Sequence, residues 1–187
     1  KNYDFHFLFI GRLIKDKGIN EYIKAAEYYK KKYPNMEFNV LGILDYDNPS
    51  SISRKQFLTF KSSKYVKFHL NQNNDLVNHI TLCDCLIFPS YREGLPKSIL
   101  ECFAVGRPVI ASNVVGCNEL IQDKYNGYLF NSKDSESLIN CIDRFINTDK
   151  NLIDSFIKIN YKDFLTLYED SQIISKYLQV IYDKKNF

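Results

Sequence analysis

A short segment near the start of the sequence carries cationic residues between two glycines. Arg12 and Lys17 lie in the segment from Gly11 to Gly18. A guanidinium matches a pair of phosphate oxygens with its planar fork, and an ammonium adds a point charge. The segment has neither the GxGxxG pattern of dinucleotide-binding proteins nor a Walker loop. It therefore favours some other phosphorylated ligand, with solvated loop charges as the alternative.

A second segment combines a carboxylate, a glycine and a helix start. It runs PSYREGLP from Pro89 to Pro96, and a helix is expected over Lys97–Val105, with Gly106 after its end. Gly94 frees the backbone just before the helix, and the first turn of a helix presents unpaired N–H groups at its positive end. The segment predicts an anion site with Glu93 at its border.

Glu101 follows Glu93 by eight positions and lies in an otherwise apolar stretch of this helix. A carboxylate in such surroundings needs a partner. At about 1.5 Å per residue, Glu101 lies roughly 7–8 Å along the helix axis from Pro96, about the span from a phosphate to the ribose of one nucleotide. Vicinal hydroxyls would suit this carboxylate. The alternatives are an exposed Glu on a rotated helix and an i,i+4 pair with Lys97.

Short apolar runs alternate with segments of helical spacing, which predicts a parallel sheet with right-handed crossovers. The fold class expected is a doubly wound, Rossmann-like α/β domain, whose ligands bind at the carboxyl ends of the strands. Gly11 and Gly42 are expected to end the first two strands, and Asp75 to cap a helix. The expected strands are Phe5–Ile10, Met36–Leu41, Tyr65–Leu70, Cys85–Phe88, Pro108–Ala111 and Gly127–Phe130. The expected helices begin at Ile19, Ser53, Asp75 and Lys97, with a turn over Asn71–Asn74 and a largely helical remainder from Asp134 to Tyr182.

Composition excludes several classes of protein. The chain has 187 residues, 45% of them hydrophobic and 25% charged, which suits one globular domain. No apolar run approaches the ~20 residues of a membrane span. A balance of 25 basic against 22 acidic side chains argues against nucleic-acid binding. Five cysteines without a CxxC pair, and three dispersed histidines, predict packed, reduced thiols, no metal site and a cytoplasmic protein.

Several segments together, in order, resemble the donor-binding half of the GT-B glycosyltransferases, specifically the retaining family 4 (glycosyl transferases group 1). The resemblance extends from about Phe5 to Phe130. It implies that residues 1–187 form the C-terminal, nucleotide-sugar-binding domain of a longer protein, with helices from about residue 151 packing toward a missing N-terminal domain. The segments that carry it are GRLIKDKG, PSYREGLPKSILE, GRPVIAS, VVGCNEL and NGYLF.

The resemblance also implies roles for particular residues. Arg12 and Lys17 would hold the donor diphosphate, Glu93 the sugar hydroxyls and Glu101 the ribose. The chain departs from the family pattern at three places. The family often has a second glycine directly after the position of Gly42 and a glycine at the position of Leu70. It usually has glycine or proline at the position of Val115. The implied catalytic residues are Arg12, Lys17 and Glu93. The implied donor-binding residues are Gly11, Arg12, Lys17, Leu70, Glu93, Gly94, Leu95, Pro96, Glu101, Gly116 and Glu119.

The implied reaction is transfer of a hexose from a nucleoside-diphosphate sugar to a hydroxyl acceptor with retained anomeric configuration and no metal. The acceptor, a glycan or a lipid-linked glycan, would bind the missing domain, so the fragment alone would be inactive. Bacterial surface polysaccharide or glycolipid synthesis is expected, with peripheral contact at the inner membrane face through Lys30–Lys32 or, alternatively, a solvated helix end. The alternatives are a nucleotide-sugar epimerase of GT-B architecture and a non-catalytic nucleotide-binding module.

Overall fold

The computed structural model describes residues 4–71, 75–169 and 171. Its centre is a six-stranded sheet in which every neighbouring pair is parallel, in the order β3-β2-β1-β4-β5-β6. The predicted doubly wound α/β class is therefore confirmed. The strands are β1 (His6–Arg12), β2 (Glu37–Ile43), β3 (Lys67–Leu70), β4 (Cys85–Phe88), β5 (Val109–Ser112) and β6 (Tyr128–Phe130).

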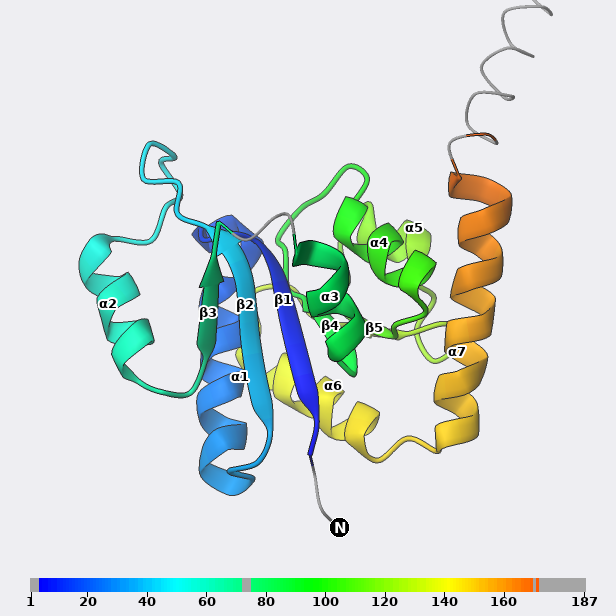
Figure 1. Ribbon diagram of the computed structural model, residues 1–187, viewed down its shortest axis with the longest axis horizontal. Helices are drawn as coiled ribbons and strands as arrows, with labels where there is room; N and C mark the ends of the chain where they lie inside the picture. The colour runs from blue at the N-terminus through cyan, green and yellow to red at the C-terminus, as the bar shows by residue number, and fades with distance from the viewer. Residues whose placement is uncertain (1–3, 72–74, 170, 172–187) are drawn as a thin grey trace, which may run out of the picture.

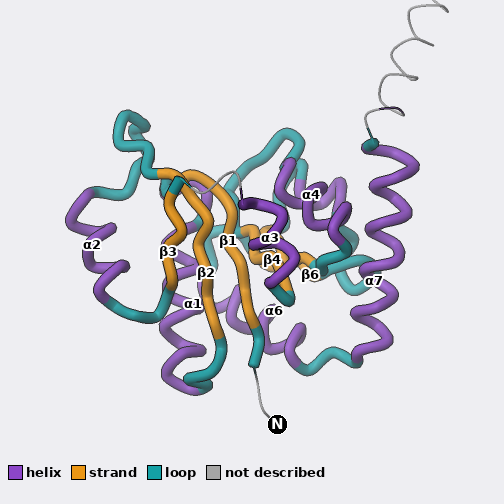
Figure 2. The backbone as a smooth tube through the Cα atoms, in the orientation of Figure 1, coloured by secondary structure: helices purple, strands orange, loops and turns teal. Residues whose placement is uncertain are grey.

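Helices cover both faces of the sheet (Figures 1 and 2). Helices α1 and α6 share one apolar core with the strands, and α3, α4 and α5 form a second core on the opposite face. Helix α7 packs against α4. The helices are α1 (Ile19–Lys32), α2 (Arg54–Ser62), α3 (Leu76–Leu82), α4 (Lys97–Val105), α5 (Cys117–Leu120), α6 (Ser135–Ile146) and α7 (Lys150–Asp163), with a 3₁₀ turn η1 (Lys15–Lys17) and a π turn η3 (Phe164–Tyr168).

Tyr22 anchors α1 beneath the first two strands. Its side chain is fully buried, and its hydroxyl donates to the Asn39 carbonyl at 2.9 Å, with the Phe7 carbonyl also at 3.1 Å. A buried phenol needs such an acceptor, since an unpaired hydroxyl in an apolar core costs free energy. Because Phe7 and Asn39 lie on β1 and β2, this contact fixes the helix that begins directly after the first candidate loop.

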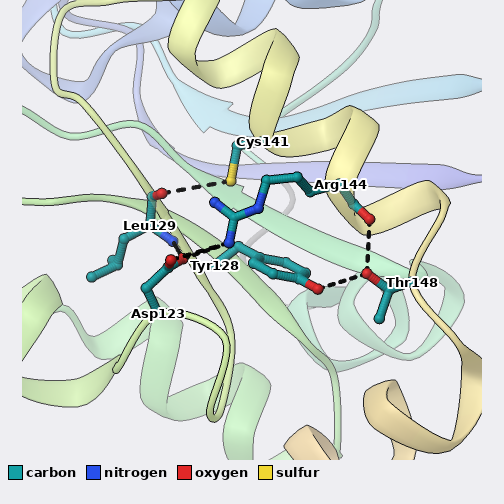
Figure 3. A network of polar contacts seen from close by, with 6 residues as sticks. All are labelled: Asp123, Tyr128, Leu129, Cys141, Arg144 and Thr148. Atoms are coloured by element: carbon teal, nitrogen blue, oxygen red, sulfur yellow. Dashed lines mark hydrogen bonds and ion pairs between the residues drawn. The ribbon is translucent and has the colours of Figure 1, made fainter.

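A polar network joins β6 to α6 (Figure 3). The guanidinium of Arg144 lies 3.1 Å from both carboxylate oxygens of Asp123 and 4.4 Å from the centroid of the Tyr128 ring. The Tyr128 hydroxyl lies 2.6 Å from the Thr148 Oγ1. A single guanidinium nitrogen, Nη2, donates to both carboxylate oxygens while the guanidinium lies over the Tyr128 ring, and these contacts together orient the Arg144 side chain. The network therefore holds the last strand and the loop before it against α6.

The expectation that Gly11 and Gly42 end their strands is wrong. Gly11 pairs with Gly42, and Arg12 with Ile43, so the β1–β2 ladder continues one residue beyond both glycines. A Cβ on Gly42 would lie only 2.7 Å from the Gly11 carbonyl oxygen. Glycine at this position permits close approach of two strands, and it does not terminate them.

Two expectations about the helices are confirmed in position. Asp75 is the N-cap residue of α3, but its side chain accepts no hydrogen bond from the backbone amides of that helix and accepts one from the Asn78 side chain instead. The described chain after Asp134 is largely helical, with a break between α6 and α7, where the Asp149 carboxylate caps α7 through the amide of Asn151. Most of the expected turn over 71–74 and the helix expected beyond 171 lie outside the described residues. Among the residues described, no helix combines the length and the apolarity that crossing a bilayer requires.

Candidate functional site

The loop between β1 and α1 lies directly on the loop that follows β4. Gly18 has a left-handed backbone (φ 72°), and a Cβ there would come within 2.0 Å of the Pro89 carbonyl oxygen. The Asp16 carbonyl accepts hydrogen bonds from the Tyr91 amide at 2.8 Å and from the Ser90 hydroxyl at 3.3 Å. Only glycine satisfies both the backbone angle and the close approach. The two candidate segments of the sequence thus form one surface at the carboxyl edge of the sheet.

Lys17 and Glu93 meet across this contact. The Lys17 ammonium donates a short hydrogen bond to Oε1 of Glu93, and the two side chains are 23% and 12% exposed. The ammonium also lies 5.8 Å from the centroid of the Phe88 ring. Partial burial strengthens such an ion pair, since less water screens it than at the open surface. The structure therefore brings together two of the three predicted catalytic side chains.

The loop after β5 completes the surface. A Cβ on Gly116 (φ 84°) would lie 2.4 Å from the Gly94 carbonyl oxygen and 2.8 Å from that of Glu93. The Ser112 hydroxyl donates to the Ser90 carbonyl, which ties the end of β5 to the same loop. Three strand-end loops therefore converge around Glu93, which the order β1-β4-β5 in the sheet requires.

Cys117 is buried at the start of α5, in the electrostatic field of Glu93 and Lys17. Burial raises the pKa of its thiol to about 12, and the nearby Glu93 carboxylate acts in the same direction. The thiol therefore stays protonated at neutral pH, and it serves as a small packing group beneath the loops.

Three cations line one cavity of about 330 Å³ at this edge. Arg12 and Lys17 were predicted there, and Arg92 was not. Nη1 of Arg12 lies 2.9 Å from Oδ2 of Asp45, whereas Arg92 forms no ion pair with any described residue. The complete lining is Arg12, Ile14, Asp16, Lys17, Asn48, Pro49, Ser50, Ser90 and Arg92.

Glu101 lies outside that cavity lining. It is half-buried in α4, and burial raises the pKa of its carboxyl, an effect that nearby Lys97 opposes. The two side chains form no ion pair closer than 4 Å in the part of the chain described here. The structure does not bring Glu101 to Arg12 and Lys17 around one cavity.

The start of α4 is open to an anion. Pro96 is the N-terminal cap, and its extended backbone (φ −76°, ψ 94°) places it just outside the helix. No side-chain hydrogen bond caps this end within the described residues, so the first amides have no side-chain competitor for a bound anion. Gly94 and Leu95, directly before it, are exposed.

The remaining predicted residues occupy different positions around this edge. Gly11 lies inside β1, and Leu70 is the half-buried last residue of β3, paired with Gly42. Glu119 is exposed on α5 and lines a separate hollow of about 530 Å³ that also includes Asp163 of α7. The structure therefore leaves Glu119 apart from the cavity that Arg12 and Lys17 share.

Sequence reasoning missed the roles of Arg92 and Asp45. Arg92 stood inside the segment that drew attention to Glu93, so its charge was the available signal. Asp45 had no such signal, because its contact with Arg12 joins residues 33 positions apart. The side chain of Ser50, which donates to Oδ1 of Asp16 at 2.7 Å, was missed for the same reason.

The three histidines, dispersed in the sequence, line a different hollow of about 320 Å³ on a sheet face. The ring centroids of His69 and His79 lie 4.5 Å apart, and His69 Nε2 lies 3.0 Å from Oδ1 of Asn39. Burial lowers the pKa of His69, and His79 adds to that effect. Within the described chain no three His, Cys, Asp or Glu side chains cluster closely enough to hold a metal ion.

The fold of this chain is shared with solved glycosyltransferase structures. The chain superimposes on the C-terminal domain of a glycosyl transferase group 1 family protein (LpcC) from Francisella tularensis with a TM-score of 0.74, at 27% identity, over 89% of this chain and 87% of that one. It also matches HepE from Anabaena, solved with UDP and glucose, with a TM-score of 0.82 at 20% identity, over 96% of this chain and 48% of that one. The fold is thus that of the C-terminal half of a GT-B protein.

The chain belongs to the family of glycosyl transferases group 1, because the sequence model of that family matches residues 1–163. It is 32% identical over 177 residues to an N,N'-diacetylbacillosaminyl-diphospho-undecaprenol alpha-1,3-N-acetylgalactosaminyltransferase from Campylobacter jejuni, covering 95% of this chain and 44% of that one. It is 28% identical to the capsular polysaccharide biosynthesis glycosyltransferase CapM from Staphylococcus aureus, covering 97% and 47%. The chain thus spans less than half the length of these relatives.

The contact between Gly18 and Pro89 makes a testable prediction. Gly18→Ala should lower the free energy of unfolding by about 2 kcal/mol or more, because it adds both backbone strain and a backbone clash. Gly94→Ala is the matched control, since a Cβ there meets no atom within 4 Å. Urea unfolding followed by circular dichroism measures both variants. Equal stabilities for the two would contradict the account of the loop contact.

Proposed function

We propose that this chain is the donor-binding domain of a retaining glycosyltransferase that transfers a hexose from a nucleoside-diphosphate sugar to a hydroxyl acceptor. Family membership supports the class of reaction. The observation that carries the proposal for this chain is the convergence of three strand-end loops on the Lys17–Glu93 pair, beside a cavity lined by Arg12 and Arg92. This arrangement provides positive charge for a diphosphate and a carboxylate acceptor for sugar hydroxyls.

The reaction creates negative charge on the leaving diphosphate. The bond between the anomeric carbon and the diphosphate oxygen breaks, and its electron pair stays on that oxygen. The acceptor oxygen bonds to the anomeric carbon on the same face, and its proton passes to a donor phosphate oxygen. Arg12, Lys17 and the first amides of α4 would stabilise the diphosphate, and only the part of that stabilisation that grows toward the transition state raises the rate.

Other residues would position the donor along the edge of the sheet. Glu93 would accept hydrogen bonds from the sugar hydroxyls, and Glu101 from the ribose. Leu70, at the end of β3, would border the base. Gly116 lets the loop after β5 approach the Glu93–Gly94 backbone, and Glu119 would contact the donor only if that loop moved toward the cavity. The residues named hold charge and hydrogen bonds in place, so the proposal needs no metal ion.

The acceptor belongs to the part of the protein that this chain lacks. Relatives carry names that refer to diphospho-undecaprenol acceptors and to capsular polysaccharide. By that similarity we propose an acceptor glycan, free or lipid-linked, in bacterial surface polysaccharide or glycolipid synthesis, at the cytoplasmic face of the inner membrane. The isolated chain would bind donor and transfer no sugar.

Calorimetric titration of the chain with UDP, GDP and ADP sugars tests the proposal. One of the three should bind, and Arg12→Ala should weaken binding of the corresponding nucleoside diphosphate roughly tenfold or more, since hydrogen bonds to charged groups are worth about 1.5–3 kcal/mol. Binding of the free nucleoside should change little. Folded protein that takes up none of the three donors would refute the proposal, and equal losses for diphosphate and nucleoside would refute the role of Arg12.

Glu101→Gln tests the proposed ribose contact separately. It should weaken nucleoside binding roughly tenfold, because the ribose hydroxyls lose a charged hydrogen-bond acceptor. Glu136→Gln, an exposed change on α6, should leave nucleoside binding unchanged.

The same variant has an expected effect on stability. Because burial raises the pKa of Glu101, its ionised form is disfavoured in the folded protein, and the charge costs stability at neutral pH. The variant should therefore melt at the same or a slightly higher temperature at pH 7. That difference should shrink as the pH falls through the raised pKa, where the wild-type carboxyl becomes protonated. A marked loss of thermal stability at pH 7 would assign Glu101 to the fold instead of to the ligand.

A further inference from the structure

The loop between β2 and α2 forms one wall of the cavity. Asn48, Pro49 and Ser50 contribute to the lining. The loop is held to the β1–α1 loop by backbone hydrogen bonds from Leu13 to Ile43 at 2.9 Å and from Lys15 to Ser50 at 2.8 Å. In Figure 1 this cyan loop lies above the upper ends of β2 and β3. A side chain of this loop is therefore placed to influence what the cavity binds.

Asp45 is the residue of this loop that contacts a cavity cation. Its Oδ2 lies 2.9 Å from Nη1 of Arg12, and the two side chains are 28% and 52% exposed. An ion pair this open to water contributes little net free energy, typically about 1 kcal/mol or less. A ligand that brings two or more negative charges to the cavity would therefore displace the carboxylate from Arg12.

The other two cations of the cavity differ in their ion pairing. Lys17 is paired with Glu93 in a much more buried contact, and Arg92 carries no ion pair among the described residues. Of the two carboxylates paired with cavity cations, Asp45 is the more exposed one. Asp45 is also absent from the donor contacts predicted from the sequence, whereas Glu93 is among them.

We propose that Asp45 is a countercharge that competes with the donor diphosphate for Arg12, which lowers the affinity of the cavity for the diphosphate and leaves the affinity for a neutral nucleoside unchanged. This rests on the proposed function, because it assigns the cavity to a diphosphate. Asp45 repels phosphate weakly and equally whatever the base, and a neutral nucleoside does not sense it. Asp45 acts through Arg12 and is thus a residue that sets donor affinity, without being a catalytic one.

Asp45→Asn tests this against Asp47→Asn, which makes the same change in net charge at an exposed position of the same loop without an ion pair in the described structure. Calorimetry with UDP, with inorganic pyrophosphate and with uridine separates charge from base. Asp45→Asn should tighten binding of UDP and pyrophosphate about two- to fivefold, the range of an exposed ion pair, and leave uridine unchanged. Asp47→Asn should change each by less than about twofold. In 1 M salt the gain should largely vanish, since the Debye length falls to about 3 Å.

Each outcome has a defined consequence. Weaker binding by Asp45→Asn would overturn the inference and make Asp45 a support that orients Arg12. Unchanged binding, or an equal gain from Asp47→Asn, would also overturn it. If the wild-type chain binds neither a nucleoside diphosphate nor pyrophosphate, the proposed function fails and this inference fails with it. A wild-type chain that binds them, without the gain from Asp45→Asn, refutes the inference alone.

Discussion

The close contact between Gly18 and the Pro89 carbonyl is the constraint on which the candidate site rests. A side chain at position 18 would force the β1–α1 loop away from the loop after β4. Lys17 would then lose Glu93, because the two lie on opposite sides of that contact. The parallel order of β1, β4 and β5 adds the third loop through the equally close approach of Gly116. Backbone packing, and not any single charge, therefore creates the surface.

Once the loops are in contact, two of the three cations of the cavity have a carboxylate partner. Lys17 is neutralised by Glu93 in a half-buried pair and Arg12 by Asp45 in an exposed one, while Arg92 remains without an ion-pair partner among the described residues. Such a surface can exchange partners, because a diphosphate offers each cation more negative charge than a single carboxylate does.

Local sequence patterns were sufficient to predict much of the fold and part of the candidate site. The apolar runs and the helix spacing predicted all six strands and the main helices, because burial between two layers of helices demands those patterns. They also placed Arg12, Lys17 and Glu93 at strand ends, where a parallel sheet collects its loops. Strand ends were less well predicted: β1 and β2 pass through Gly11 and Gly42, since the ladder continues when two glycines let the backbones approach closely.

The sequence by itself determined the α/β class, the edge of the sheet that carries the candidate site, and the residue types available there. Only the tertiary structure decided which charge meets which. The pairing of Asp45 with Arg12, the place of Arg92 in the cavity and the separation of Glu119 from it all follow from how loops far apart in the chain pack together. Coulombic attraction and packing act over a few ångströms in space, and spacing along the chain does not encode those distances until the fold is formed.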